Sequence, residues 1–99
     1  MEIKKEKNGT VLTLALAGRL DAATAPELDA CIKQEISGLT ELTLDFAALE
    51  YIASAGLRVL LVAEKLMRKQ GKMRLVHVNP NVREVLDMTG FLQFLNVEE

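Results

Sequence analysis

Residues 44–70 read LDFAALEYIASAGLRVLLVAEKLMRKQ, and this stretch decides the fold. Its first three residues end an alternating apolar pattern over residues 41–46 that predicts a half-buried strand. After a short loop, the pattern predicts a helix from about Ser54 to Gln70, with Gly71 as its stop. The middle of this helix is apolar on nearly every side, which indicates that the helix packs deeply in the core.

The rest of the chain repeats this alternation of strand and helix. Asn8 and Gly9 are typical of a hairpin turn between two strands, and Gly18 is the predicted stop of the second strand. Thr24 and Glu27 have the spacing of a capping box at the start of a helix. The predicted elements are strands over residues 2–7, 10–17 and 73–78, helices over residues 24–38 and 79–90, and a short segment with one strand over residues 91–97.

This order of elements predicts an α/β fold. Strands separated by helices imply crossover connections and therefore a mostly parallel sheet. The opening hairpin adds one antiparallel pair, so we expect a mixed sheet of about four to five strands. Few strand segments are apolar on both sides, so the helices are expected mainly on one face of the sheet.

Composition and length predict one globular domain over residues 1–99. Hydrophobic residues make up 49% of the chain and charged residues 26%, a balance that disordered chains lack. A single cysteine, Cys31, excludes an internal disulfide and falls in the apolar stripe of the first helix, where it is expected to be core. The first ten residues lack an apolar leader, and no apolar run approaches the roughly 20 residues that span a bilayer. We therefore expect a cytoplasmic protein without membrane insertion.

Charge is divided unevenly along the chain. Residues 21–50 carry seven acidic residues and one basic residue, whereas residues 51–74 carry six basic residues and one acidic residue. The formal net charge of the whole chain is −2, which argues against a nucleic-acid partner. The basic block has two interpretations: its cations suit the dipole at the end of a helix, or they form a docking patch for an acidic partner.

The sequence contains few residues of the kinds that catalysis needs. The one histidine, His77, falls inside a predicted strand between two valines, where a structural role is expected. One histidine and one cysteine cannot complete a zinc site, and no phosphate-binding glycine loop or dinucleotide-binding turn is present. The residues around Ser54 depart from the G-x-S-x-G motif of serine hydrolases, so a hydrolase built on Ser54 and His77 has no motif to support it. We expect no catalytic residue, no metal site and no cofactor.

Ser54 has a position that suits either a structural or a functional role. It opens the long helix, where unpaired backbone N–H groups and the positive end of the helix dipole are exposed. In the structural interpretation Ser54 is the N-cap, which is worth about 1 kcal/mol. Gly56 is unusual in a first helical turn, because glycine costs up to about 1 kcal/mol there relative to alanine. Its presence indicates that the backbone turns tightly or that another group approaches it closely.

Two motifs together resemble those of the STAS domain family, and specifically its bacterial anti-sigma factor antagonists. One comprises LDF at residues 44–46 and YIASAGLRVLL at residues 51–61, and the other is GRLD at residues 18–21, followed by an Ala/Thr-rich helix start. The resemblance covers essentially the whole chain, implies a STAS fold, and maps Ser54 onto the serine that is phosphorylated in the family. The partner-binding residues that it implies are Asp21, Thr24, Tyr51, Ala53, Ser54, Gly56, Leu57 and Arg58.

The resemblance implies partner switching and no enzyme activity. Such relatives bind a serine-kinase anti-sigma factor and thereby free a sigma factor; phosphorylation at the position of Ser54 releases the kinase, and a serine phosphatase resets the protein. Many relatives carry Asp or Ser before the phosphorylated serine, where this chain has Ala53, and this departure bears on kinase specificity. Other STAS proteins are subunits of membrane transport complexes of the lipid ABC type and are not phosphorylated, which gives the alternative function.

Overall fold

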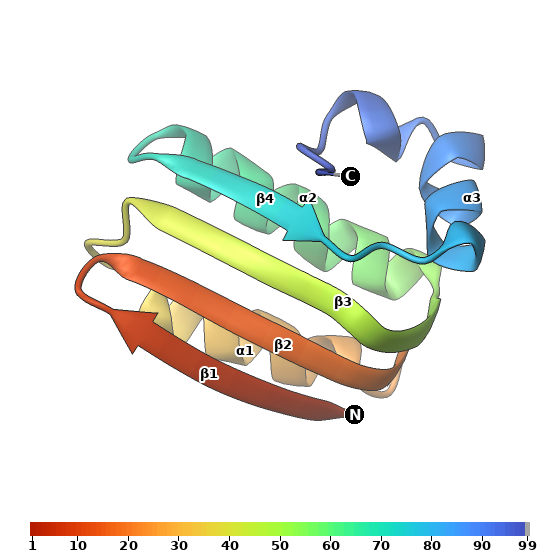
Figure 1. The fold of residues 1–99 in the computed structure, drawn as a ribbon, viewed down its shortest axis with the longest axis horizontal. Coiled ribbons are helices and arrows are strands. Elements are labelled where there is room, and N and C mark those ends of the chain that lie inside the picture. The colour runs from red at the N-terminus through yellow and green to blue at the C-terminus, as the bar shows by residue number, and fades with distance from the viewer. Residues whose placement is uncertain (99) are drawn as a thin grey trace.

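A computed structural model describes residues 1–98, which form a four-stranded sheet with three α-helices. The elements in chain order are β1 (Glu2–Asn8), β2 (Val11–Leu20), α1 (Ala25–Glu35), β3 (Glu41–Ile52), α2 (Ser54–Arg68), β4 (Lys72–Val76), α3 (Pro80–Met88) and a 3₁₀ helix η1 (Phe91–Gln93). The spatial order of the strands is β1-β2-β3-β4, with β1 antiparallel to β2 and the other pairs parallel. Helices α1 and α2 lie behind the sheet in Figure 1, whereas α3 lies beyond the end of β4. The predicted mixed sheet with helices mainly on one face is confirmed.

The core lies between this sheet and the helices behind it. Leucines alternate along β2, and Leu12 and Leu14 pair in register with Leu42 and Leu44 of β3, so both strands present an apolar face to the helices. The helices complete the core with Leu28 and Ile32 of α1, Leu60 and Met67 of α2, and Val82 and Leu86 of α3.

The two central strands are longer than predicted. Gly18 does not end β2: it has a φ of 101°, the register with β3 shifts beside it, and the strand continues to Leu20. The two register shifts between β2 and β3 also turn Phe46, Leu49 and Ile52 toward the core at a spacing of three residues. The strict alternation that predicts a strand therefore stops at Phe46, although the strand itself does not.

Helix α1 begins where the sequence predicts, but the predicted capping box is wrong. Thr24 already has a helical backbone, and its side chain makes no capping hydrogen bond. Its hydroxyl instead donates to the carbonyl oxygen of Arg19 at 2.7 Å, so it braces the loop before the helix. Cys31 is half-buried against the core, as its place in the apolar stripe predicts, and burial raises the pKa of its thiol.

The second half of the chain departs from prediction at three places. Helix α2 is not buried on every side, since Val62 is 43% exposed. Strand β4 ends at Val76, so His77 lies beyond it. Within residues 91–98 the expected strand is replaced by η1 and an isolated parallel bridge between Val97 and Leu75.

Candidate functional site

Ser54 is the first residue of α2 and directly follows the loop that ends β3. The N-cap of this helix is Ala53, with an extended backbone at φ −108° and ψ 174°, and its methyl side chain makes no capping hydrogen bond. The interpretation of Ser54 as the N-cap is therefore wrong by one residue. The Ser54 side chain is exposed, and within residues 1–98 no hydrogen bond engages its hydroxyl. Ser54 thus presents a free hydroxyl to solvent at the positive end of a helix.

Gly56 and Leu57 lie beneath this surface and belong to the core. A β-carbon on Gly56 would lie 2.6 Å from Cγ of Leu20 and 3.1 Å from Cγ1 of Ile52. The close approach that a first-turn glycine indicates is therefore the packing of α2 against the ends of β2 and β3. Leu57 is 4% exposed. Both residues position the helix start and offer a partner little side-chain surface.

Asp21 organises the loop between β2 and α1. Its carboxylate accepts hydrogen bonds from the backbone N–H groups of Ala23 at 3.0 Å and Thr24 at 3.1 Å. The N–H of Thr24, with further help from the Thr24 hydroxyl and Arg19, holds the pKa of Asp21 below its usual range. Asp21 is therefore an anion whose Oδ1 fixes the shape of its own loop.

The loop of Asp21 and the loop of Ser54 lie side by side at one end of the sheet (Figure 1). Leu20 pairs with Ile52 at the end of the parallel β2–β3 ladder, and the N–H of Ala53 donates to the carbonyl oxygen of Leu20 at 2.9 Å. This bond joins the residue before Ser54 to the residue before Asp21. The carboxyl ends of two adjacent parallel strands thus bring the two sequence motifs together.

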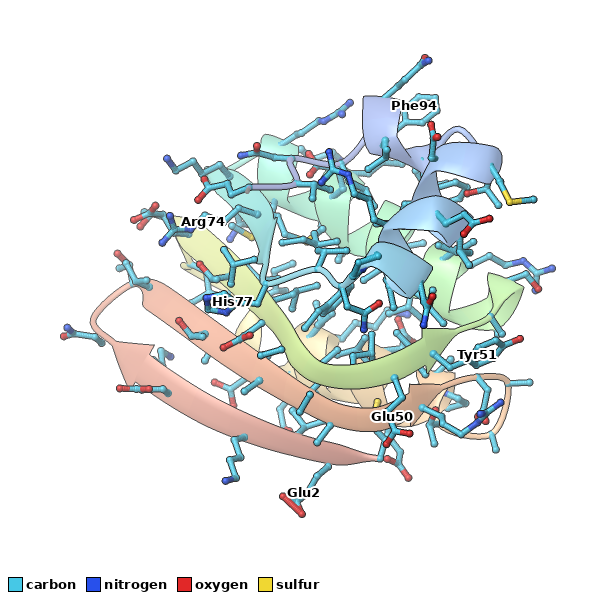
Figure 2. All side chains as sticks on the ribbon, turned by 45° about the vertical axis from the view of Figure 1, so that its right-hand side comes forward. Glu2, Glu50, Tyr51, Arg74, His77 and Phe94 are labelled. Carbon is cyan, nitrogen blue, oxygen red and sulfur yellow. The ribbon has the colours of Figure 1, made fainter. Side chains whose placement is uncertain are left out.

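Tyr51 and Arg58 extend the exposed surface around Ser54. Tyr51 is 41% exposed, and the guanidinium of Arg19 lies 4.4 Å from the centre of its ring. Figure 2 shows Tyr51 projecting at the far end of β3. Beside it is a hollow of about 230 Å³, lined by Glu50, Tyr51, Ile52, Asn81, Val82 and Val85. Arg58 is exposed one helical turn after Ser54.

His77 and Asp45 form a pair that the sequence analysis missed. His77 follows β4 with a φ of 57°, and its Nδ1 lies 2.9 Å from Oδ1 of Asp45. Burial raises the pKa of Asp45, but hydrogen bonds from the Ala47 N–H and from His77 outweigh it, so the pKa lies below the usual range. The pairing could not be predicted because it depends on the β3–β4 register, in which Asp45 lies beside Val76.

The arrangement of these side chains does not support hydrolysis. Figure 2 shows His77 well away from Tyr51, which lies at the Ser54 end of β3. Within residues 1–98 no hydrogen bond joins Ser54 to His77.

The same residues contain no group of three His, Cys, Asp or Glu side chains that could hold a metal ion. None of the helices in that range is long and apolar enough to cross a membrane. The site around Ser54 is an exposed surface formed where β2 and β3 end and α2 begins.

Several known proteins are similar to this chain in sequence or in structure. The STAS domain family model matches residues 2–99. The chain is 38% identical to "Putative anti-sigma factor antagonist BtrV" of Bordetella bronchiseptica, over 98% of this chain and 85% of that protein. The crystal structure of an anti-sigma factor antagonist from Mycobacterium paratuberculosis is similar, with a TM-score of 0.87 and 24% identity, over 97% of this chain and 83% of that one. The Bacillus cell fate determinant SpoIIAA in its phosphorylated form is similar with a TM-score of 0.77 and 20% identity, over 99% of this chain and 92% of that one.

Proposed function

Because this chain belongs to the STAS domain family, we propose that it is an anti-sigma factor antagonist. It binds a serine-kinase anti-sigma factor, so that a sigma factor held by that kinase is released. The kinase phosphorylates Ser54, and the phosphorylated protein dissociates from it. A serine phosphatase removes the phosphate and restores binding. The protein itself carries out no reaction.

The observation that carries this proposal is the exposed hydroxyl of Ser54 beside the Asp21 loop. A kinase needs a hydroxyl that is accessible and not already bonded within the fold. The Ser54 hydroxyl lies one residue after the N-cap, is exposed and makes no hydrogen bond within residues 1–98. The relative SpoIIAA exists in a phosphorylated form with a similar fold. A helix start also accommodates a phosphate without refolding, because its N–H groups and dipole favour negative charge.

The electrostatic repulsion from one phosphate is sufficient to release the kinase. Phosphorylation adds about −1.5 to −2 charges at neutral pH. A thousandfold loss of affinity corresponds to about 4 kcal/mol. Two like charges about 4 Å apart near a protein surface supply roughly that amount at an effective dielectric constant of 20. Asp21, already ionised and on the adjoining loop, strengthens the negative potential that an acidic or closely fitted partner surface would meet.

The first prediction concerns phosphate transfer to Ser54. We expect the mass of the intact chain to rise by one phosphate after incubation with its cognate serine kinase and ATP, and the mass of Ser54→Ala to stay unchanged. Ser54→Ala should still bind the kinase, because it keeps a small neutral side chain. Ser54→Asp should bind more weakly, although its single charge weakens binding less than phosphate.

Two results would contradict the proposal. One is equal phosphorylation of the wild-type chain and Ser54→Ala. The other is the absence of phosphate with every serine kinase of the same cell, together with stable co-purification with a transport ATPase. The second result would assign the chain to the transport-complex subunits and leave Ser54 unmodified.

A further inference from the structure

We propose that Arg58 binds the phosphate on Ser54, so that phosphorylation removes a cation from the partner surface as well as adding negative charge. The inference rests on the proposed function only for the claim that Ser54 is the modified residue. It concerns what the phosphorylated helix does, and it can be tested without a kinase.

The spacing and direction of the two side chains favour this contact. Ser54 is the first residue of α2 and Arg58 is four residues later, so the two lie on the same exposed face one turn apart. Side chains on a helix lean toward its N-terminus, so Arg58 covers the turn that carries Ser54. An anion placed four residues before a cation is the more favourable order of such a pair.

Arg58 is available for this contact. Arg19 lies over Tyr51 and is near a carboxylate, whereas Arg68 and Arg74 each donate to a carboxylate. Within residues 1–98, in contrast, no hydrogen bond or ion pair engages Arg58. Its guanidinium fork matches two phosphate oxygens, a geometry that a lysine cannot offer.

The uncapped start of α2 also favours the phosphate. Ala53 contributes no side-chain acceptor to the first turn, so phosphate oxygens on Ser54 can accept from N–H groups there. The nearest competing anion on the adjoining loop is Asp21, and its carboxylate is already bonded to the N–H groups of its own loop. A phosphate on Ser54 therefore meets an unengaged cation, Arg58, one turn further along its own helix.

The two states of Ser54 differ in what Arg58 presents to a partner. With a free hydroxyl, Arg58 extends from α2 and can bind a carboxylate on the kinase. With phosphate on Ser54, the guanidinium turns back and is neutralised locally. A partner with an acidic group facing Arg58 thus loses the cation that it binds. The same phosphorylation of Ser54 places a repelling anion opposite that acidic group.

The test uses the chain with phosphate on Ser54, made by incorporating phosphoserine during translation. The phosphorus resonance is followed against pH in the wild-type chain, in Arg58→Gln and in Lys65→Gln, an exposed lysine further along α2. We expect the second phosphate proton to dissociate about twofold more readily in the wild-type chain than in Arg58→Gln. Lys65→Gln should match the wild type, and Arg58→Lys should recover only part of the effect. The charges of Asp21, Arg19 and Glu50 at this end of the sheet are common to all variants.

Equal titration of the phosphate in the wild-type chain and Arg58→Gln would overturn the inference. A second readout checks the same contact: phosphorylation should raise the thermal unfolding midpoint of the wild-type chain more than that of Arg58→Gln. The unphosphorylated forms of these two chains should unfold alike, which shows that the substitution spares the fold. Failure of every kinase to modify Ser54, together with co-purification with a transport ATPase, would contradict the proposed function and leave this result standing.

Discussion

Ala53 takes the N-cap position of α2, so Ser54 is the first helical residue and its hydroxyl does not cap the helix. An alanine in the N-cap position makes no side-chain bond to the first turn, whereas Ser, Asp or Asn would make one there. In this chain the start of α2 is held instead by the bond from the N–H of Ala53 to the carbonyl oxygen of Leu20. The start of the helix is therefore held by a bond to the sheet at Ala53. The hydroxyl of Ser54, the next residue, takes no part in holding it.

A serine in place of Ala53 should stabilise the protein. The backbone of Ala53 already has the extended conformation of an N-cap, so Ala53→Ser can bond the first turn without rearrangement. We expect the free energy of unfolding to rise by about 1 kcal/mol, measured by urea denaturation. Ala55→Ser, inside the first turn, is the matched control and should bring no gain. A loss of stability in Ala53→Ser would show that the position tolerates only a methyl group.

The helix start at Ser54 was predicted, but its N-cap could not be identified from residue types. Serine is among the commonest N-cap residues and alanine among the rarest, so the sequence places the N-cap at Ser54. The true cap depends on the bond to Leu20, which lies more than thirty residues earlier in the chain. The local pattern nevertheless placed Ser54 at the start of the helix, because that needs only the neighbouring residues.

At the scale of elements, the fit between α2 and the two central strands defines the site. The helix start lies against the ends of β2 and β3 at Gly56, where no β-carbon fits without displacing Leu20. Strand alternation and helical periodicity predicted that these elements exist. They did not predict the register shifts that carry β3 on to Ile52, because a shift depends on the neighbouring strand.

Gly56→Ala should loosen this contact. Alanine suits a helix better than glycine by about 1 kcal/mol, but the added methyl would overlap Leu20, and such overpacking costs about 1–3 kcal/mol. We expect a net loss of stability in urea denaturation and faster hydrogen exchange at Ala53. Gly56→Ala should cost less stability in a Leu20→Ala background than in the wild-type chain, since the methyl then has room. Unchanged exchange at Ala53 in Gly56→Ala would contradict this account of the glycine.

At the scale of the whole molecule, the sheet has one face covered by α1 and α2 and one face open (Figure 1). The open face carries its own polar contacts, among them the pair of Asp45 and His77 and the bond from Nε of Arg74 to the hydroxyl of Thr43 at 3.0 Å. Figure 2 shows Arg74 on β4, and His77 just after the end of β4, on this side. The mostly parallel pairing and the covered face followed from the sequence pattern, whereas these cross-strand contacts required the register.

Asp45 should make the stability of the fold sensitive to acid. The pKa of Asp45 is lower in the folded state than in the unfolded chain. Its contribution to the free energy of unfolding is therefore complete above about pH 4 and is lost as the pH falls through the folded-state pKa. The urea midpoint of the wild-type chain should therefore fall more steeply below about pH 4 than that of Asp45→Asn. Asp87→Asn, at an exposed carboxylate on α3, should follow the wild type. If the urea midpoints of the wild-type chain and Asp45→Asn fall equally with pH, Asp45 is not a source of the acid sensitivity.

Both borders of the sheet are protected against added strands. Strand β1 is the outer strand on one side, and five of its seven residues, EIKKEKN, are charged. On the other side, the N–H of Leu75 on β4 donates to Asn96 and its carbonyl oxygen accepts from Glu98, so the C-terminal segment occupies backbone positions that another chain would use. Neither edge of the sheet is thus an open template for a strand of another molecule, which disfavours growth into a fibre.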